Sequence, residues 1–420
     1  MAVTGGRGAV QRLLGRLAVR APAPVFALAG PGWHDAVEAL RLDQRVRLVD
    51  SPRHATVLLV AGELPPDTAD ASALVHDGLP RPRATVWWGP AEGDAPGGHF
   101  RGVEAVPAGA DVAATLAQVS GELLTGARAS DPPLLPDVDP VEWRGKGPYG
   151  HGGAGMTGGT PFGRPMADRA PDRDGLALDV VPITVGPFFP ALPPGLTLRV
   201  TFQGDVIHEL EVRRMPWWRA RSESGRIGIA ELEVARARQH LRWLAHALRL
   251  QGLAGLGLRA LALAEQPGGP DRAAAERMVR MVRRLPLRWM TRGLGRLSAD
   301  DVAGHGLGVV ARASGVVEDA RVGDPAYAAL GFEPVLRLGG DACARMEVRL
   351  DEIGQSLELA SRSQGAAPAV TEPAVQDVPH RLQELLPRLL VGLEWGEAVT
   401  AVTSLDLRGV GAPAPAAVHP

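Results

Sequence analysis

Sulfur ligands are almost absent from this chain of 420 residues, which contains one cysteine, Cys343. A single thiol excludes an intramolecular disulfide, and it cannot supply the four thiolates that hold an iron–sulfur cluster. Lysine is equally scarce, since Lys146 is the one lysine and arginine provides the remaining basic residues. The formal net charge of −2 lacks the excess of positive charge typical of nucleic-acid-binding proteins, so no nucleic acid partner is expected.

Long apolar runs are missing as well. No uncharged apolar stretch reaches the ~18 residues that a membrane-spanning helix needs. The nearest candidate, residues 241–264, contains three arginines and is interpreted as a buried amphipathic helix. Arginines also interrupt the first 24 residues too often for a signal peptide, so we expect a cytoplasmic protein.

Several motifs of catalytic and metal sites do not occur. The sequence has no G-x-S-x-G of a hydrolase and no H-E-x-x-H of a metalloprotease. The eleven histidines include no pair spaced i, i+4, so a metal site is not expected. These absences leave binding, scaffolding and cofactor-dependent functions open.

The pattern of residues predicts two domains of different class, as the length also favours. Residues 24–128 alternate short β-branched apolar runs with helical spacing, which predicts an α/β domain with a doubly wound, mainly parallel sheet. A Pro/Gly-rich stretch follows, and then a β-hairpin with a bundle of helices, an α+β domain. We predict four segments: 1–130, the linker loop 131–175, 176–410, and a disordered tail 411–420.

Local signals define the second domain. "LTLRVTF" and "DVIHELEV" alternate in polarity around Gln203-Gly204, which predicts a hairpin with these two residues as its turn. Residues 229–296 have helical spacing, with one helix opening at an acidic residue and broken before Pro286. A closing strand is expected at residues 401–409.

A glycine turn near the N-terminus has two interpretations. Gly30 and Gly32 lie between a predicted strand and a predicted helix, and Asp50 ends the next strand, which is the layout of a dinucleotide-binding fold. Asp35 stands where that motif has its third glycine, and a carboxylate there would repel a phosphate. The alternative is a plain Gly-Pro-Gly turn at a strand end.

A basic helix face also has two interpretations. Arg277, Arg280 and Arg284 are spaced along one face of the predicted helix. Such a face is either merely solvated, or it contacts an acidic partner subunit or anionic lipid headgroups.

Stretches in both domains resemble one superfamily. "SPRHATVLLVAGELP", "GLPRPRATVWWGP" and "GGHF" resemble the small, cluster-bearing subunit of respiratory complex I (NADH-quinone oxidoreductase) and of [NiFe]-hydrogenases. "VGPFFPALPPGLTLRVTFQGDVIHELEV" and the long stretch from "GVVARASG" to "GQSLELA" resemble the large, quinone-site subunit, and "TSLDL" is similar to its C-terminal strand. The resemblance implies a fusion of the two subunits, small before large.

The departures from that family concern its redox groups. The family has a Cys-Cys pair after the first strand, where this chain has Gly30, Pro31, Gly32 and Trp33. The loops of the other two cluster ligands contain no cysteine, and the C-x-x-C pairs of a Ni–Fe centre are absent. The resemblance places a quinone pocket at Phe188, Phe189 and Pro190, with Phe189 in place of a proton-donating histidine.

The resemblance also explains the many charges around the RASG motif. It implies that this stretch lies inside the large-subunit domain near the small-subunit domain, where buried charges have to be paired. The network either only holds the two halves together or transmits strain to a membrane module. The expected members are Arg312, Asp319, Arg321, Asp341, Arg345, Arg349 and Glu352.

These observations lead to three functional hypotheses. The first is a cluster-free fused scaffold in the peripheral arm of a complex-I-like assembly, not catalytic alone. It would be attached to the inner face of the cell membrane, with membrane ion-transporting subunits and ferredoxin-like subunits as partners. The second is a quinone-site component that receives electrons from partner subunits. The third is a dinucleotide-binding protein that uses the Gly30/Gly32 turn.

Overall fold

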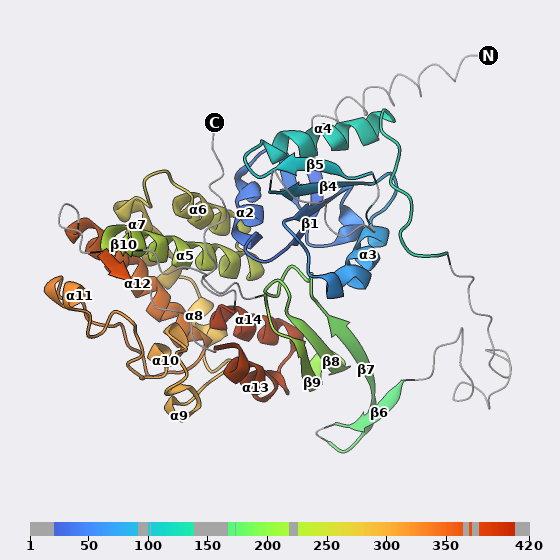
Figure 1. Cartoon of the computed structure of the whole chain (residues 1–420). Coiled ribbons are helices and arrows are strands. Elements are labelled where there is room, and N and C mark those ends of the chain that lie inside the picture. The colour runs from blue at the N-terminus through green and yellow to red at the C-terminus, as the bar shows by residue number, and fades with distance from the viewer. Residues whose placement is uncertain are drawn as a thin grey trace, which may run out of the picture.

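The computed structural model describes residues 21–90, 100, 102–137, 167–172, 174–217, 226–363, 369–371 and 378–407. Its first part contains a five-stranded parallel sheet in the order β2-β1-β3-β4-β5 (Figure 1). The strands are β1 (Ala23–Ala29), β2 (Val46–Leu48), β3 (Val57–Ala61), β4 (Ala84–Gly89) and β5 (Glu104–Pro107). The predicted parallel sheet is therefore confirmed.

Helices cover both faces of this sheet. Every residue of β3 and β4 is buried, as expected for central parallel strands covered on both sides. Helices α2 (His34–Ala39) and α4 (Val112–Thr125) pack on one face, and the segment around α3 (Ala69–Gly78) packs on the other. Three short 3-10 helices complete the connections: η1 (Leu40–Leu42), η2 (Pro52–His54) and η3 (Pro66–Thr68).

A second sheet is antiparallel, in the order β6-β7-β8-β9. Its strands are β6 (Asp168–Pro171), β7 (Ala177–Val185), β8 (Thr197–Gln203) and β9 (Val206–Arg214). Gln203 pairs with Val206, so the turn residues are Gly204 and Asp205, one position later than predicted. Gly204 has a φ of 64°, which glycine adopts without strain.

Helices predominate in the described residues from 226 onward. The long helices are α5 (Ile229–Leu250), α6 (Ala254–Ala264), α7 (Arg272–Arg283), α12 (Ala342–Arg362), α13 (Val378–Leu390) and α14 (Trp395–Leu405). The short ones are α8 (Leu287–Thr291), α9 (Ala299–Val302), α10 (Val309–Ala313) and α11 (Pro325–Ala329), and β10 (Arg226–Gly228) pairs with β11 (Ala369–Thr371). Helix α12 is central, because α5, α7, α8, α10 and α14 all pack against it.

One of two predictions about the end of the chain is wrong, and the other lies outside the described residues. The expected closing strand at 401–409 is wrong, since its described residues form the end of helix α14 and its C-cap. β-branched residues favoured a strand, but Ala398, Val402 and Leu405 recur at helical spacing and are buried. Packing therefore overrides local propensity here. The predicted tail 411–420 lies outside the described residues.

The predicted linker loop 131–175 is only partly described, since residues 138–166 and 173 lie outside the described ranges. Its later part forms β6, which pairs with β7. No helix among the described residues is both long and apolar enough to cross a bilayer.

Candidate functional site

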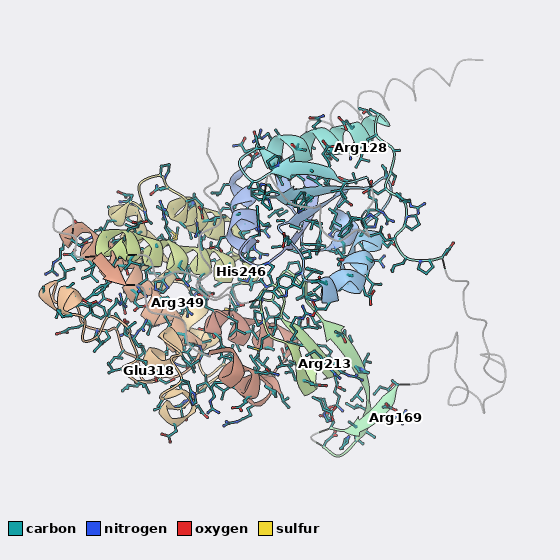
Figure 2. All side chains as sticks on the ribbon, viewed as in Figure 1. Arg128, Arg169, Arg213, His246, Glu318 and Arg349 are labelled. Carbon is teal, nitrogen blue, oxygen red and sulfur yellow. The ribbon has the colours of Figure 1, made fainter. Side chains whose placement is uncertain are left out.

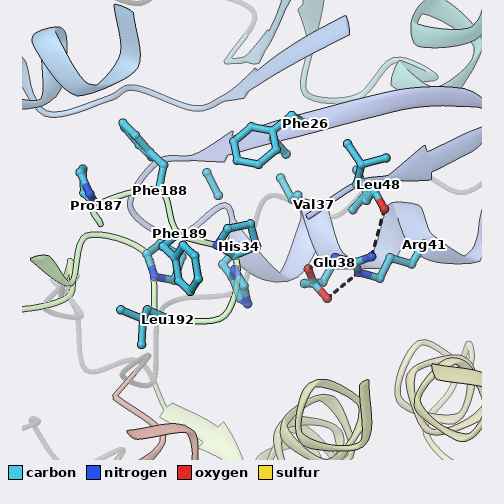
Figure 3. Close-up of a pocket in the computed structure, with 15 residues that line it drawn as sticks. Phe26, His34, Val37, Glu38, Arg41, Leu48, Pro187, Phe188, Phe189 and Leu192 are labelled. Atoms are coloured by element: carbon cyan, nitrogen blue, oxygen red, sulfur yellow. Dashed lines mark hydrogen bonds and ion pairs between the residues drawn. The ribbon is translucent and has the colours of Figure 1, made fainter. Parts of the chain in front are cut away.

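A small cavity lies where the N-terminal sheet meets the loop before β8 (Figure 3). Phe188 of this loop packs into the core on one face of the sheet and meets Trp217 edge to face at 5.8 Å. Phe189 meets Trp395 in the same way at 5.9 Å. All three residues predicted for a quinone pocket, Phe188, Phe189 and Pro190, line the cavity. Its volume is about 60 Å³.

The polar groups of this cavity come from α2 and the η1 helix that follows it. Nε of Arg41 donates to Glu38 at 2.9 Å, and Nη1 of Arg41 donates to the carbonyl of Leu48 at 3.4 Å. Burial by itself would raise the pKa of Glu38, but Arg41, with smaller contributions from His34 and Arg249, outweighs burial and lowers that pKa. Glu38 is therefore an ionised acceptor at neutral pH and cannot donate a proton to a ligand.

Trp33 fills the crevice at the carboxyl ends of β1 and β3. In a sheet of this strand order, ligands bind at that crevice, because the chain order reverses there. Trp33 is 8% exposed and meets Trp88, near the end of β4, edge to face at 5.2 Å. Its ring also lies on Gly62, where an added Cβ would come 2.1 Å from Cδ1 of Trp33. An indole thus occupies the position where a ligand would sit.

The residues proposed for a dinucleotide do not fit one. A Cβ at Gly30 would come 2.3 Å from the carbonyl oxygen of Glu63, so this glycine is needed for close backbone packing. Helix α2, which follows Gly32, has six residues, and Asp50 pairs with Arg249 at 3.1 Å. With Trp33 in the crevice, the geometry favours the plain Gly-Pro-Gly turn.

Ion pairs join the sheet domain to the rest of the chain. Arg242 of α5 reaches Asp35 at 3.2 Å, and Arg249 of the same helix reaches Asp50. Arg214 of β9 pairs with Asp67. Between these contacts lie the rings of His34 and His246, 6.3 Å apart, and Figure 2 shows His246 between the helices and the sheet. The two halves therefore meet through mixed polar and aromatic contacts.

We predict that the Arg249–Asp50 pair contributes little to stability. The carboxylate of Asp50 is 64% exposed, so water and salt screen the attraction. A double-mutant cycle with Arg249→Gln and Asp50→Asn, followed by urea unfolding, should give a coupling of about 0.2–1 kcal/mol. A coupling free energy several times larger would mean that this ion pair makes a substantial contribution to holding the two halves together.

A buried ion-pair cluster lies deeper in the helical part. Arg312 donates to Glu352 at 2.8 Å and lies 3.0 Å from Asp319. Arg321 donates to Asp319 at 2.7 Å and to Glu352 at 2.8 Å. All four side chains are at most 4% exposed. The structure thus brings together four of the seven residues proposed for the charge network.

Helix α5 contributes three further members that the sequence analysis missed, Glu233, Arg236 and His240, and α11 contributes Tyr327. Glu233 accepts from Arg321 at 3.3 Å and from the hydroxyl of Tyr327 at 2.7 Å. Nε2 of His240 lies 3.1 Å from Oε2 of Glu352. Glu233 and His240 share the buried face of α5 with Ala237 and Leu244. Charged or polar residues at helix positions that otherwise face the core could have indicated a buried polar cluster from the sequence alone.

The charges of this cluster balance. The carboxylates of Glu233, Asp319 and Glu352 face the guanidinium groups of Arg312, Arg321 and Arg236, the last at 3.4 Å from Glu233. Burial opposes ionisation of Glu352, but His240 and Arg312 outweigh it and lower its pKa well below the usual value. Burial lowers the pKa of His240, which is therefore neutral at pH 7.

The other three residues of the proposed network make different contacts. Asp341 is the N-cap of α12 and accepts from the backbone of Ala344 and Gly293. Arg345, 0% exposed, donates to Ser404 and to two backbone carbonyl groups. Burial, reinforced by Arg349, lowers the pKa of Arg345 to about 9. Arg349 donates to the carbonyl of Ser404 at 2.9 Å, so these arginines attach α12 to α14.

Acid is expected to destabilise the fold in two phases. The pKa of His240 is lowered from 6.5, and those of Glu352 and Asp319 from 4.5 and 3.8. The unfolded chain therefore binds more protons in both ranges, and stability falls as pH falls. Urea unfolding at stepped pH should show a decline below about pH 6.5 that steepens below about pH 4.5. His240→Gln should reduce the first phase, and a stability that rises on acidification would contradict the assignment.

The proposed basic face lies on α7 and at its end. Arg277 and Arg280 are exposed on α7, and Arg284 is its exposed C-cap. These residues lie apart from the cavity and the buried cluster, neither of which includes α7. They form no part of one continuous site with the others.

Comparisons with known proteins find a family model and two relatives that match part of the chain. Residues 275–384 match the family model described as respiratory-chain NADH dehydrogenase, 49 Kd subunit. A D-type subunit of the NADH-quinone oxidoreductase of Salinispora tropica is 40% identical over 96 residues, which cover 22% of this chain and 25% of that protein. The protein of the same name from Salinispora arenicola gives the same identity and coverage.

The matched family segment contains the buried ion-pair residues Arg312, Asp319, Arg321 and Glu352. The expected likeness to the large subunit is confirmed for this part of the chain. The chain spans about a quarter of the length of the curated relatives it matches.

Proposed function

We propose that this chain is a cluster-free subunit of a complex-I-like membrane assembly, in which small-subunit-like and large-subunit-like parts are fused into one scaffold. The family match of residues 275–384 supports the large-subunit-like part. The doubly wound sheet before it, with its sequence likeness, supports the small-subunit-like part. The ion pairs and aromatic contacts between the two parts support a fixed body.

The packing of Trp33 carries the cluster-free part of the proposal. The resemblance places the first two cluster cysteines after β1, where Trp33 now lies, and the third ligand loop begins at the end of β4, next to Trp88. These two indoles touch each other, and Trp33 also lies on Gly62. The thiolates that would bind a cluster are missing, and in addition the two indole rings fill the volume at these strand ends where the cluster would lie. We infer that the chain keeps the fold of an electron-transfer subunit but does not itself transfer electrons.

Metal analysis tests this part of the proposal directly. The purified full chain, as isolated and after anaerobic incubation with iron and sulfide, should contain no stoichiometric iron and give no paramagnetic cluster signal on reduction. A cysteine-bearing small subunit of a complex I, treated in parallel, controls for the incubation. Stoichiometric iron in this chain would refute the proposal.

The scaffold part of the proposal concerns partners. The neighbours implied by the resemblance are membrane ion-transporting subunits and ferredoxin-like subunits on the inner face of the cell membrane. Affinity purification of the tagged chain from its native membranes, followed by mass spectrometry, should recover such subunits. Recovery of the chain alone from gently solubilised membranes would argue against membership of an assembly.

A quinone-site component is a second candidate, because Phe188, Phe189 and Pro190 line the cavity at the position that the sequence analysis predicted. The cavity of about 60 Å³ is far below the ~300 Å³ at which small-molecule pockets begin. A quinone head group therefore does not fit unless the Phe189 ring, 37% exposed, turns away. Binding of a short-chain quinone to the unaltered chain, abolished by Phe189→Asp, would favour this candidate. Equal quinone binding by the unaltered chain and the variant, or none by either, would exclude it.

A further inference from the structure

A basic surface at the corner between α7 and α8 has no role in the proposed scaffold. The stretch from Arg277 to Arg296 contains seven arginines and no acidic residue. Both helices pack along α12 (Figure 1). We call seven exposed residues of this stretch the corner surface: Arg277, Arg280, Met281, Arg284, Trp289, Met290 and Arg292. Arg288 and Arg296 are exposed as well but are not counted in it.

The geometry of α7 separates this surface from the core. Arg277, Arg280, Met281 and Arg284 are spaced i, i+3, i+4 and i+7, so they lie on one face of the helix turn after turn. The opposite face contributes Met278, Val279 and Val282 to the core shared with α12. The outward face is therefore fixed by burial of the inward face.

Most of the charge on this surface is not neutralised by the protein itself. Arg283 and Arg288, outside the corner surface, are bound to Glu347 of α12. Arg280 lies 3.7 Å from Glu276, which also pairs with Arg272. Within the described part of the chain, Arg277, Arg284 and Arg292 form no ion pair with a carboxylate. Three exposed guanidinium groups thus remain for an external anion.

Large apolar side chains stand among these arginines. Trp289 is 77% exposed, Met290 57% and Met281 37%. The guanidinium group of Arg292 lies 5.6 Å from the centre of the Trp289 ring. Single exposed apolar residues are ordinary, but tryptophan beside arginine is typical of the headgroup region of a bilayer, where the ring is half immersed and the cation meets phosphate.

We propose that the corner surface binds the face of an anionic bilayer, with its arginines on lipid phosphate and carboxylate groups and Trp289 with Met290 in the interfacial region. An acidic protein is the other conceivable occupant. The bilayer is favoured because it accepts tryptophan, methionine and arginine together without a matched shape. Glu276, at the edge of this surface, lies 3.7 Å from Arg280, so its charge is opposed by that arginine. This inference concerns the isolated chain and does not depend on the scaffold proposal.

Vesicle sedimentation tests the proposal on the purified full chain. The chain should bind vesicles of phosphatidylserine with phosphatidylcholine and should not bind vesicles of phosphatidylcholine alone. Combining Arg277→Gln, Arg284→Gln and Arg292→Gln should weaken binding about a hundredfold, since each arginine near such a surface contributes about fivefold. Trp289→Ala should also weaken it, and ~1 M salt should abolish the electrostatic part.

A matched variant separates a specific surface from general charge. Arg169, Arg199 and Arg213 are exposed on the four-stranded sheet, and Figure 2 shows Arg169 and Arg213 there. Changing these three to glutamine removes the same charge and should leave vesicle binding unchanged. Equal losses in both triple variants, or no binding by the unaltered chain, would overturn the proposal. Capture of an acidic subunit through this surface, without vesicle binding, would overturn it as well.

Discussion

Glu352→Gln is expected to destabilise the protein by about 3–5 kcal/mol, because it removes one charge from a buried cluster and leaves its partners without compensation. Glu352 is 0% exposed and accepts from both Arg312 and Arg321 at 2.8 Å. Glutamine keeps the size of the side chain, so the loss reports charge and not a cavity. The measurement is urea-induced unfolding followed by tryptophan fluorescence at pH 7.

The same helix offers the control. Glu358 lies on α12 as well, is 41% exposed, and pairs with Arg272 at the surface. Glu358→Gln should therefore change stability by no more than about 1 kcal/mol. From the sequence we expected this network to hold the two halves together, but its contacts join α5, α11, α12 and the 312–321 segment within the helical part. If the two variants lost similar stability, the buried cluster would contribute no more to that packing than a surface pair does.

Trp33→Ala is expected to cost about 3–5 kcal/mol, since it empties the volume between Trp88 and Gly62 that the indole fills. The rigid ends of β1, β3 and β4 have little freedom to close the gap. Trp289→Ala is the matched control, because Trp289 is 77% exposed and should change stability by less than about 0.5 kcal/mol.

Thermal and urea unfolding of both tryptophan variants check this expectation. A Trp33→Ala protein as stable as the parent would show that the strand ends do not depend on the ring. The filled-crevice argument for a cluster-free body would then lose its structural support. The metal analysis is independent of this result, so the two experiments test the same conclusion by different routes.

Local patterns in the sequence predicted the elements whose signals are themselves local. The buried runs of β3 and β4 predicted a parallel sheet, and Asp271 and Pro286 bracketed helix α7, which begins at Arg272 and ends at Arg283. The hairpin turn was misplaced by one residue, because both Gln203-Gly204 and Gly204-Asp205 satisfy a two-residue turn and only strand pairing decides between them.

The candidate site depends on contacts that no local pattern contains. Glu233 and Tyr327 are 94 positions apart in the sequence, and only the packing of α5 beside α11 brings them together. Conversely, Asp341 and Arg345 have the spacing of an ion pair, yet Asp341 serves the free backbone N–H groups at the start of α12. Spacing states which contacts are geometrically allowed, and the surrounding fold selects among them.

Because the sheet domain and the helical domain belong to one polypeptide, their docking is an intramolecular event. A tether of this kind gives each partner an effective concentration on the order of millimolar, whatever the amount of protein in the cell. The contacts between the halves, the half-exposed Arg242–Asp35 pair among them, then have to supply together only about 4 kcal/mol to keep the halves closed. Separate chains with the same contacts would need a tighter interface to stay associated at cellular dilution.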